Sequence, residues 1–231
     1  MELSAAIGEA FRLLFSFDAN LWGVIWVSLR VSLLALLIAA PPAIALGFFL
    51  ATVPFRGRRF AVIVLQSFLS FPTVVVGLVL YVLLARSGPF GHFGLLYTQE
   101  AMIAGQAIIA FPVLAAFTLT AVQGADRIVR ETALSLGASR GRAALTTLFE
   151  VRFAVMAGLF NGFGRVISEV GCAMMVGGNI AGLTRNIPTA ISLETAKGEF
   201  AQGIALGFVL IVLALAVNAA LHFFQGEGGM K

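Results

Sequence analysis

The chain has 231 residues, of which 60% are hydrophobic and 11% are charged, and its net charge is +4. Soluble domains carry about a quarter charged residues, so this sequence has too little polar surface to cover a globule in water. The composition excludes an ordinary soluble protein and predicts an integral membrane protein. The basic residues lie in short segments between apolar stretches, which membrane topology explains more simply than nucleic-acid binding does.

Metal, disulfide and nucleotide sites have little support in the sequence. Cys172 is the single cysteine, and His92 and His222 share no metal-ligand spacing. The sequence has no glycine-rich Gly-Lys-Ser/Thr loop that would cradle a phosphate. We therefore expect that this chain itself binds no cofactor.

Residues 1–21 predict a short amphipathic helix at the membrane surface. Its apolar residues recur at helical spacing, and no basic segment precedes them as it would in a signal peptide. An unstructured tail is the alternative. The residues that carry the pattern are Ile7, Ala10, Phe11, Leu14 and Phe15.

Five apolar stretches then predict five membrane-spanning helices within one domain, 1–231. A bilayer core of ~30 Å needs ~20 apolar residues in a helix. Trp22 and Trp26 precede the first stretch and either extend it or lie at the interface. The stretches are 31–53, 60–85, 101–122, 153–176 and 203–224.

Prolines interrupt three of these stretches. A proline removes a helix hydrogen bond and tends to kink or break the helix. Such breaks suit a bundle around a path, although kinked packing is equally common in membranes. The prolines are Pro41, Pro42, Pro72 and Pro112.

Basic residues in short loops predict the orientation, because cytoplasmic loops carry an excess of Lys and Arg. One side has Arg12, Arg86, Arg185 and Lys197. We expect this side to be external, with the N-terminus outside and the C-terminus cytoplasmic. The more basic side has Arg56, Arg58, Arg59, Arg127, Arg130, Arg140, Arg142, Arg152 and Lys231.

The basic loop 123–152 is predicted to present a helix, a glycine break and a second helix to the cytoplasm. Residues 125–136 form the first helix, and Gly137 ends it. The small residues around Gly137 would let another protein approach closely. A solvated hairpin that only joins two spans is the alternative.

The segment 131–140, Glu-Thr-Ala-Leu-Ser-Leu-Gly-Ala-Ser-Arg, resembles the "EAA loop" of ATP-binding-cassette importer permeases. The resemblance implies a coupling helix that sits in a groove of the ATPase subunit. The sequence departs from the family at Thr132, where Ala is preferred, and at 148–150, where many members have a proline. The coupling residues implied are Glu131, Thr132, Ala133, Gly137, Ala138, Ser139 and Arg140.

Arg165 and Glu169 lie within the fourth predicted span. On one helix their i, i+4 spacing places them on one face, where they would pair. Ionisable residues at membrane depth cost at least ~2.5 kcal/mol each and usually face the bundle interior or a water-filled path. They predict either a packing ion pair or a gate. Their surroundings resemble molybdate-type and tungstate-type permeases, with Ser168 and Val170 replacing Gly and Phe.

Two further segments are candidates for the path. Pro72 would free a carbonyl and Thr73 would offer a hydroxyl to a passing anion, in a stretch that resembles the same permeases. Gly177, Gly178 and Asn179 open the predicted external loop 177–202. Their bare amides, with Thr184 and Arg185, would meet an oxyanion, or they form a simple helix cap. A short helix is expected over 187–196, and 194–200 resembles the tungstate branch.

Taken over the whole chain, the resemblance implies an all-α polytopic protein with the type I ABC importer permease fold. It implies a homodimer, two ATPase subunits that use ATP and Mg²⁺, and an external substrate-binding protein, in a bacterial or archaeal cytoplasmic membrane. Tungstate is the expected substrate, ahead of molybdate, sulfate or phosphate. A membrane enzyme using Glu169, and a stand-alone secondary transporter, are the alternatives.

Overall fold

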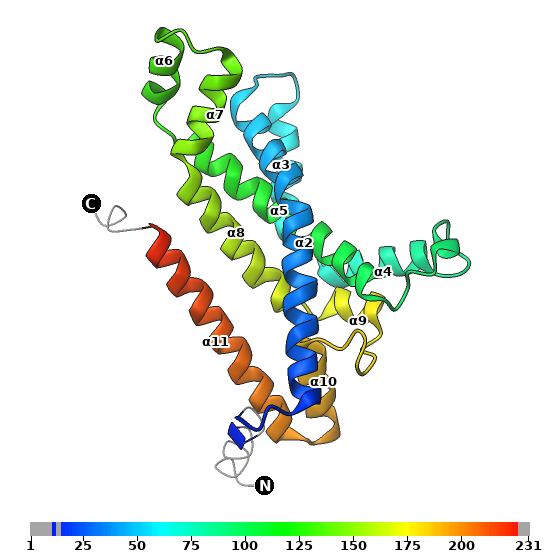
Figure 1. The fold of residues 1–231 in the computed structure, drawn as a ribbon. Helices are drawn as coiled ribbons and strands as arrows, with labels where there is room; N and C mark the ends of the chain where they lie inside the picture. Colours follow the sequence, from blue (N-terminus) through cyan, green and yellow to red (C-terminus); the bar gives the residue numbers. More distant parts are fainter. Residues whose placement is uncertain (1–10, 13–14, 226–231) are drawn as a thin grey trace.

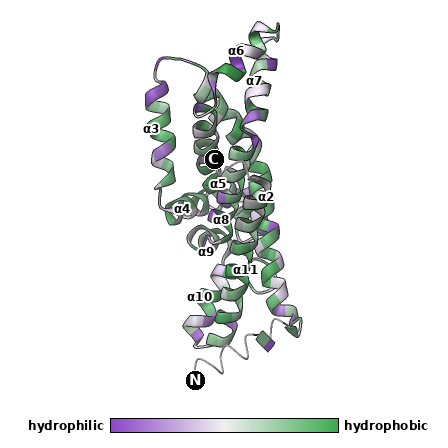
Figure 2. Ribbon diagram, turned by 90° about the vertical axis from the view of Figure 1, so that its left-hand side faces the viewer, coloured by the Kyte–Doolittle hydropathy of each residue, from purple (hydrophilic) through white to green (hydrophobic). Residues whose placement is uncertain are grey.

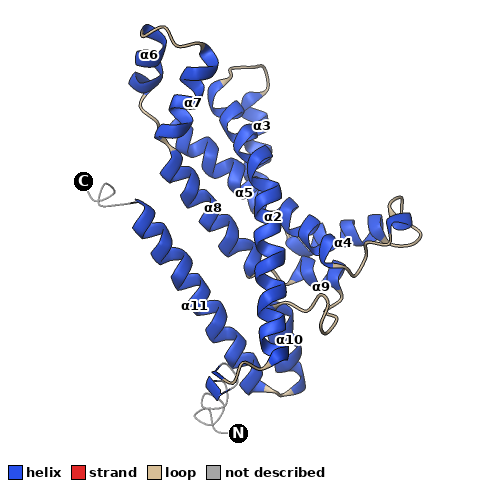
Figure 3. Cartoon of the chain, in the orientation of Figure 1, coloured by secondary structure: helices blue, strands red, loops and turns tan. Residues whose placement is uncertain are grey.

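The computed structural model describes residues 11–12 and 15–225, and within them every regular element is a helix (Figure 3). This confirms the all-α prediction. Phe11 packs on Phe208, whereas Ile7, Ala10 and Leu14 lie outside the described residues, so the interfacial helix stays a prediction. The elements are α2 (Ala19–Thr52), α3 (Arg58–Leu69), α4 (Thr73–Leu84), η1 (Gly91–Phe93), α5 (Gln99–Gln123), α6 (Arg127–Ser135), α7 (Arg140–Glu150), α8 (Arg152–Ile167), α9 (Gly171–Gly177), α10 (Ile187–Lys197) and α11 (Phe200–Gln225).

Three helices, α2, α5 and α11, are each long and apolar enough to cross a membrane. Two bent pairs pass the same test, α3 with α4 at 94° and α7 with α8 at 62°, which allows up to 5 spans in the described residues. Apolar residues dominate the middle of the molecule, and polar residues gather at the α6–α7 end (Figure 2). The chain is a multi-pass membrane protein.

The first spanning helix includes both tryptophans that precede the first apolar stretch. α2 begins at Ala19, where the Asp18 carboxylate caps it by accepting a hydrogen bond from the Leu21 N–H at 2.9 Å. Of the two alternatives for Trp22 and Trp26, the structure favours the one in which they extend the first span. Pro41 and Pro42 lie inside α2 without ending it.

The second predicted span, 60–85, is not one helix. α3 ends at Leu69 and α4 begins at Thr73, with Pro72 as its N-cap residue. Proline has no N–H to continue the helix, and it disfavours helical geometry in the residue before it. The chain turns through 94° here, so α4 and the connection to α5 form an arm that projects from the bundle (Figure 1).

The fourth predicted span, 153–176, is also wrong as a single helix. α8 ends at Ile167, and the short helix α9 begins at Gly171. The three residues between them form a second break within an apolar stretch. The expected helix over 187–196 is confirmed as α10.

The centre of the bundle is the contact between α2 and α5. Small residues recur every four positions on α2, which places them on one stripe of the helix. Such stripes let helix backbones approach closely in membranes. A Cβ atom added at Gly47 would collide with the Ala115 carbonyl oxygen and would lie 2.8 Å from Thr118 Cβ. The stripe consists of Ala35, Ala39, Ala43 and Gly47, all of them buried.

A second cluster ties α10 and the start of α11 to the start of α2. The Ser28 hydroxyl donates to the Val24 carbonyl and accepts from the Ile187 N–H at 2.7 Å. One polar side chain of α2 thereby satisfies an otherwise unpaired N–H at the start of α10. The apolar residues of the cluster are Leu21, Ile25, Ile187, Ala190, Ala205 and Leu206.

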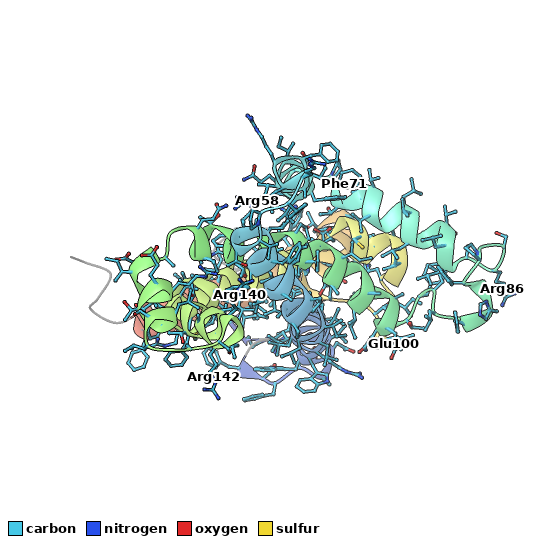
Figure 4. All side chains as sticks on the ribbon, turned by 90° about the horizontal axis from the view of Figure 1, so that it is seen from above. Arg58, Phe71, Arg86, Glu100, Arg140 and Arg142 are labelled. Atoms are coloured by element: carbon cyan, nitrogen blue, oxygen red, sulfur yellow. The ribbon has the colours of Figure 1, made fainter. Side chains whose placement is uncertain are left out.

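Arg58 fixes the turn between α2 and α3. Its Nε donates to the Leu50 carbonyl at 2.6 Å and its Nη2 donates to the Ala51 carbonyl at 3.2 Å. A cation at a helix C-terminus satisfies free carbonyls and complements the helix dipole. Arg86 lies at the far end of the arm (Figure 4).

We expect Gly47→Val to destabilise the protein by about 1–3 kcal/mol, because the added methyl groups overpack the α2–α5 contact. Thermal unfolding of the detergent-solubilised protein measures the effect. Gly23→Val is the matched control on the same helix, since a Cβ at Gly23 meets no atom within 4 Å. Equal unfolding midpoints for the two variants would contradict the close-packing interpretation.

Candidate functional site

The loop 123–152 forms the helix, glycine break and second helix that the sequence predicted. Asp126 caps the start of α6, because its carboxylate accepts a hydrogen bond from the Ile128 N–H at 2.9 Å. It ends with Gly137 at φ +85°, a conformation that L side chains rarely adopt. The Gly137 N–H donates to Leu134 and the Ala138 N–H donates to Ala133, both at 3.0 Å. This pair of bonds is a Schellman closure, which explains why the break falls at a glycine.

α7 starts directly after the glycine turn. The Ser139 hydroxyl caps it by accepting from the Arg142 N–H at 3.4 Å. Of the predicted coupling residues, Ala133 and Ala138 are half-buried. The others are exposed, namely Glu131, Thr132, Gly137, Ser139 and Arg140.

Leu136 is a surface feature that the sequence interpretation missed. Its side chain is 83% exposed at the turn between α6 and α7, and Ile128 on α6 is 65% exposed. The sequence did contain a signal for this exposed side chain, because Leu136 is an apolar residue next to the glycine break of a charged loop. Together with Glu131 and Arg140, these side chains give the end of the molecule a mixed apolar and charged surface, which is typical of a protein contact.

A polar hollow of about 760 Å³ lies beneath α6. It lies between α6 and the ends of α2 and α5, and α6 itself packs on α7. Glu131 and Arg130 reach this hollow from α6, and Arg58 reaches it from α3. α6 is therefore joined to α7 more closely than to the rest of the bundle.

The two helix breaks contact one another. Gly171 is the first residue of α9, and a Cβ added there would lie 2.5 Å from Val74 Cγ2 and 3.3 Å from the Val74 N. Val74 is the second residue of α4, two positions after Pro72. The buried Cys172 fills the space beside two further glycines, Gly77 of α4 and Gly105 of α5. The breaks therefore form one packed unit.

Arg165 and Glu169 do not pair, so that prediction is wrong. α8 ends at Ile167, which takes Glu169 off the helix face that Arg165 occupies. Both residues are described by the structure, and no ion pair joins them. The buried Glu169 carboxylate accepts from the Cys172 N–H at 3.0 Å and caps α9. The alternative of a membrane enzyme that uses Glu169 beside Arg165 is therefore not supported by the geometry.

Ser168 completes the break from the other side. Its hydroxyl lies 2.8 Å from the Gly164 carbonyl and 3.2 Å from the Arg165 carbonyl, so it closes the C-terminus of α8. Adjacent side chains, Ser168 and Glu169, thus cap two different helices. Helix ends without such partners leave unsatisfied backbone groups, which are costly away from water.

The structure brings together two of the predicted gate residues, Thr73 and Arg165. Thr73 and Phe71, on either side of Pro72, line a small cavity of about 30 Å³ with Arg165 of α8. Arg165 is exposed and also lines a larger hollow between α8 and α11. The proline break and the intramembrane cation are therefore neighbours.

Gly177, Gly178 and Asn179 lie at the opposite end of α9 from Glu169. Gly178 and Asn179 have φ +69° and +52° and end the helix. The Thr184 hydroxyl donates to the Gly177 carbonyl, and Arg185 Nη2 donates to the Asn179 carbonyl at 3.4 Å. These two side chains are thus directed at the loop's own carbonyls, which favours the helix-cap interpretation over an oxyanion site.

Acidic, histidine and cysteine side chains do not gather anywhere in the described residues in a group of three or more that would hold a metal ion.

Comparison with known proteins identifies clear relatives, although no family model matches the chain. A tungstate uptake system permease of Campylobacter jejuni is 42% identical over 214 residues, covering 93% of this chain and 90% of the relative. The tungstate uptake permease of Peptoclostridium acidaminophilum is 38% identical over 225 residues, covering 96% and 99%. The Escherichia coli molybdenum transport permease is 30% identical over 210 residues, covering 87% and 90%.

A solved structure shares the fold. A chain of a bacterial alginate ABC transporter, in complex with its alginate pentasaccharide-bound periplasmic protein, superposes with a TM-score of 0.71. The match covers 94% of this chain and 83% of that chain at 20% sequence identity. The predicted importer permease fold is confirmed.

The contact between the two breaks predicts a specific energetic coupling. We expect Gly171→Ala to destabilise the protein by about 1–3 kcal/mol, because its methyl group meets Val74. Val74→Ala removes the colliding Cγ2 atom. The variant with both substitutions should therefore be about 0.5–3 kcal/mol more stable than the sum of the two single effects predicts. Unfolding of the solubilised protein measures both. Gly207→Ala, on an open face of α11, is the control and should be additive with Val74→Ala.

Proposed function

The chain belongs to the tungstate-type permease family of ATP-binding-cassette importers, and on that premise we propose that it carries tungstate across the cytoplasmic membrane. The observation that carries the proposal is the 42% and 38% identity to two tungstate permeases over nearly the whole chain. Molybdate is the second candidate substrate, because a molybdenum transport permease is 30% identical to this chain. Sulfate is the third, because a probable sulfate transport permease is 24% identical.

This chain is a transport subunit, and ATP hydrolysis belongs to a separate ATPase. We propose that two copies enclose one path and that two ATPase subunits bind ATP and Mg²⁺ outside this chain. The single copy supports a dimer, because it leaves the intramembrane Arg165 exposed, and a guanidinium at membrane depth is costly in contact with lipid.

We propose α6 and its glycine turn as the element that docks on the ATPase. The exposed Leu136 would enter an apolar pocket of the partner, and Glu131 and Arg140 would fix the register. ATP is present only in the cytoplasm, so this assignment places the α6–α7 end inside and the external loop 177–202 outside.

The fold suggests how motion at α6 reaches the membrane. Only Val151 separates α7 from α8, and the Arg152 guanidinium stacks on Phe149 and Phe153 at 4.3 and 4.4 Å, which stiffens the joint. The far end of α8 is the break that packs on α4. Closure of the ATPases would therefore tilt α7 and α8 together and open or close the gate at Pro72, Thr73, Arg165 and Glu169 by alternating access.

Reversing the charge at Glu131 tests the docking surface. We expect Glu131→Arg to reduce co-purification of the ATPase and ATP-driven uptake by about tenfold, as loss of an interfacial charge contact does. Glu150→Arg is the control, because Glu150 is an exposed acid at the far end of α7. Unchanged association of the Glu131→Arg variant would rule out the proposed contact.

The glycine turn gives a second test. We expect Gly137→Ala to weaken ATPase association, because Ala costs about 1 kcal/mol at positive φ and shifts the end of α6. Gly57→Ala imposes the same backbone strain at φ +91° in the α2–α3 turn, where it should leave association intact. Equal effects of both variants would show that general strain, and not α6 geometry, is responsible.

Reconstitution tests the function itself. In proteoliposomes with the ATPase and the external binding protein, we expect tungstate uptake that depends on ATP on the ATPase side. Molybdate should compete less well, and sulfate least. Uptake by this chain without an ATPase would contradict the importer assignment, and a preference for sulfate would contradict the substrate.

A further inference from the structure

One face of α8 carries a polar pair within the apolar bundle. Asn161 and Arg165 are spaced i, i+4 and both are exposed on the same side of the helix. They line a hollow of about 590 Å³ between α8 and α11. The opposite wall, from α11, is apolar and consists of Leu210, Ile211, Ala214 and Val217.

The Arg165 guanidinium has no acceptor in the described part of the chain. No hydrogen bond or ion pair of its side chain is present there, and the nearby Glu169 carboxylate caps α9 instead. The Asn161 amide donates one N–H to the Ala157 carbonyl at 2.8 Å and keeps its second N–H free. The Ser168 hydroxyl is committed to helix carbonyls. The hollow therefore offers unused donors and a positive charge.

An unpaired guanidinium at membrane depth is costly in contact with lipid, so such residues face water or a ligand. Its planar fork of N–H donors fits the oxygens of an anion. The apolar wall across the hollow adds no competing negative charge. These properties favour an oxyanion as the occupant.

We propose that Asn161 and Arg165 form a transient binding site for a tetrahedral oxyanion on its way through the membrane. The proposal rests on the proposed function and deepens it. In the proposed homodimer the site occurs twice, and its two copies of Arg165 supply two positive charges, which match a dianion such as tungstate. So few donors make a weak site, which suits a path from which the ion must leave.

The sharpest test is Asn161→Asp. An aspartate four residues before an arginine pairs with it on the same helix face, so the variant occupies the Arg165 guanidinium without breaking α8. ATP-driven tungstate uptake by the reconstituted complex should fall about tenfold or more, as loss of a charge-assisted hydrogen bond predicts. Uptake by the Arg165→Gln variant should fall by a similar factor. Uptake by the Arg165→Lys variant, which keeps the charge, should stay within about threefold of the wild type.

Arg86→Gln is the matched control, because Arg86 is an exposed arginine on the arm, outside both hollows that Arg165 lines. It should leave uptake unchanged. ATPase activity stimulated by the loaded binding protein, and assembly of the complex, should persist in the Asn161→Asp and Arg165→Gln variants.

Three results would overturn the site. Normal uptake by Asn161→Asp would show that the guanidinium does not meet the ion. Loss of assembly with Arg165→Gln would make Arg165 a structural contact between copies. A wild-type complex that transports no oxyanion would remove the proposed function and this site with it, whereas failure of the site alone leaves wild-type uptake intact.

Discussion

Close contact between α2 and α5 is the constraint on which the rest of the structure depends. In a bilayer, lipid tails are as apolar as leucine, so helices associate through packing rather than through removal of apolar surface from water. The stripe from Ala35 to Gly47 is buried and brings α2 close to the α5 backbone at Gly47, and α8 packs on α5 as well. This rigid centre lets the two broken helices be irregular, because neighbouring helices bury the backbone groups that the breaks release.

The sequence predicted the number of apolar stretches and the charged helical loop, because composition and local turn chemistry determine both. It predicted α6 within two residues at its start and placed the turn at Gly137, where a left-handed residue is required. It did not predict the break at 168–170. No proline marks that break, and Ser168 and Glu169 in an otherwise apolar stretch are also compatible with a continuous helix.

The break explains why the intramembrane charges were misread as a pair. Spacing along the sequence gives neighbours only on an unbroken helix, and the caps from Ser168 and Glu169 depend on a tertiary arrangement. The proximity of Arg165 to Thr73 likewise depends on the 94° turn at Pro72, which directs α4 away from the axis of α3. The local sequence contains the residues that form each helix break. That the two breaks contact one another depends on the tertiary packing of α4 and α9.

The position of Cys172 has a consequence for following the transport cycle. Its thiol is fully buried against Gly105 of α5, its Cα atom packs on Gly77 of α4, and it is the only thiol in the chain. A state that parts α9 from α5 would uncover the thiol, and a state that keeps these two helices together would hide it. The rate at which the thiol reacts therefore reports how often α9 separates from α5, without any label being engineered into the protein.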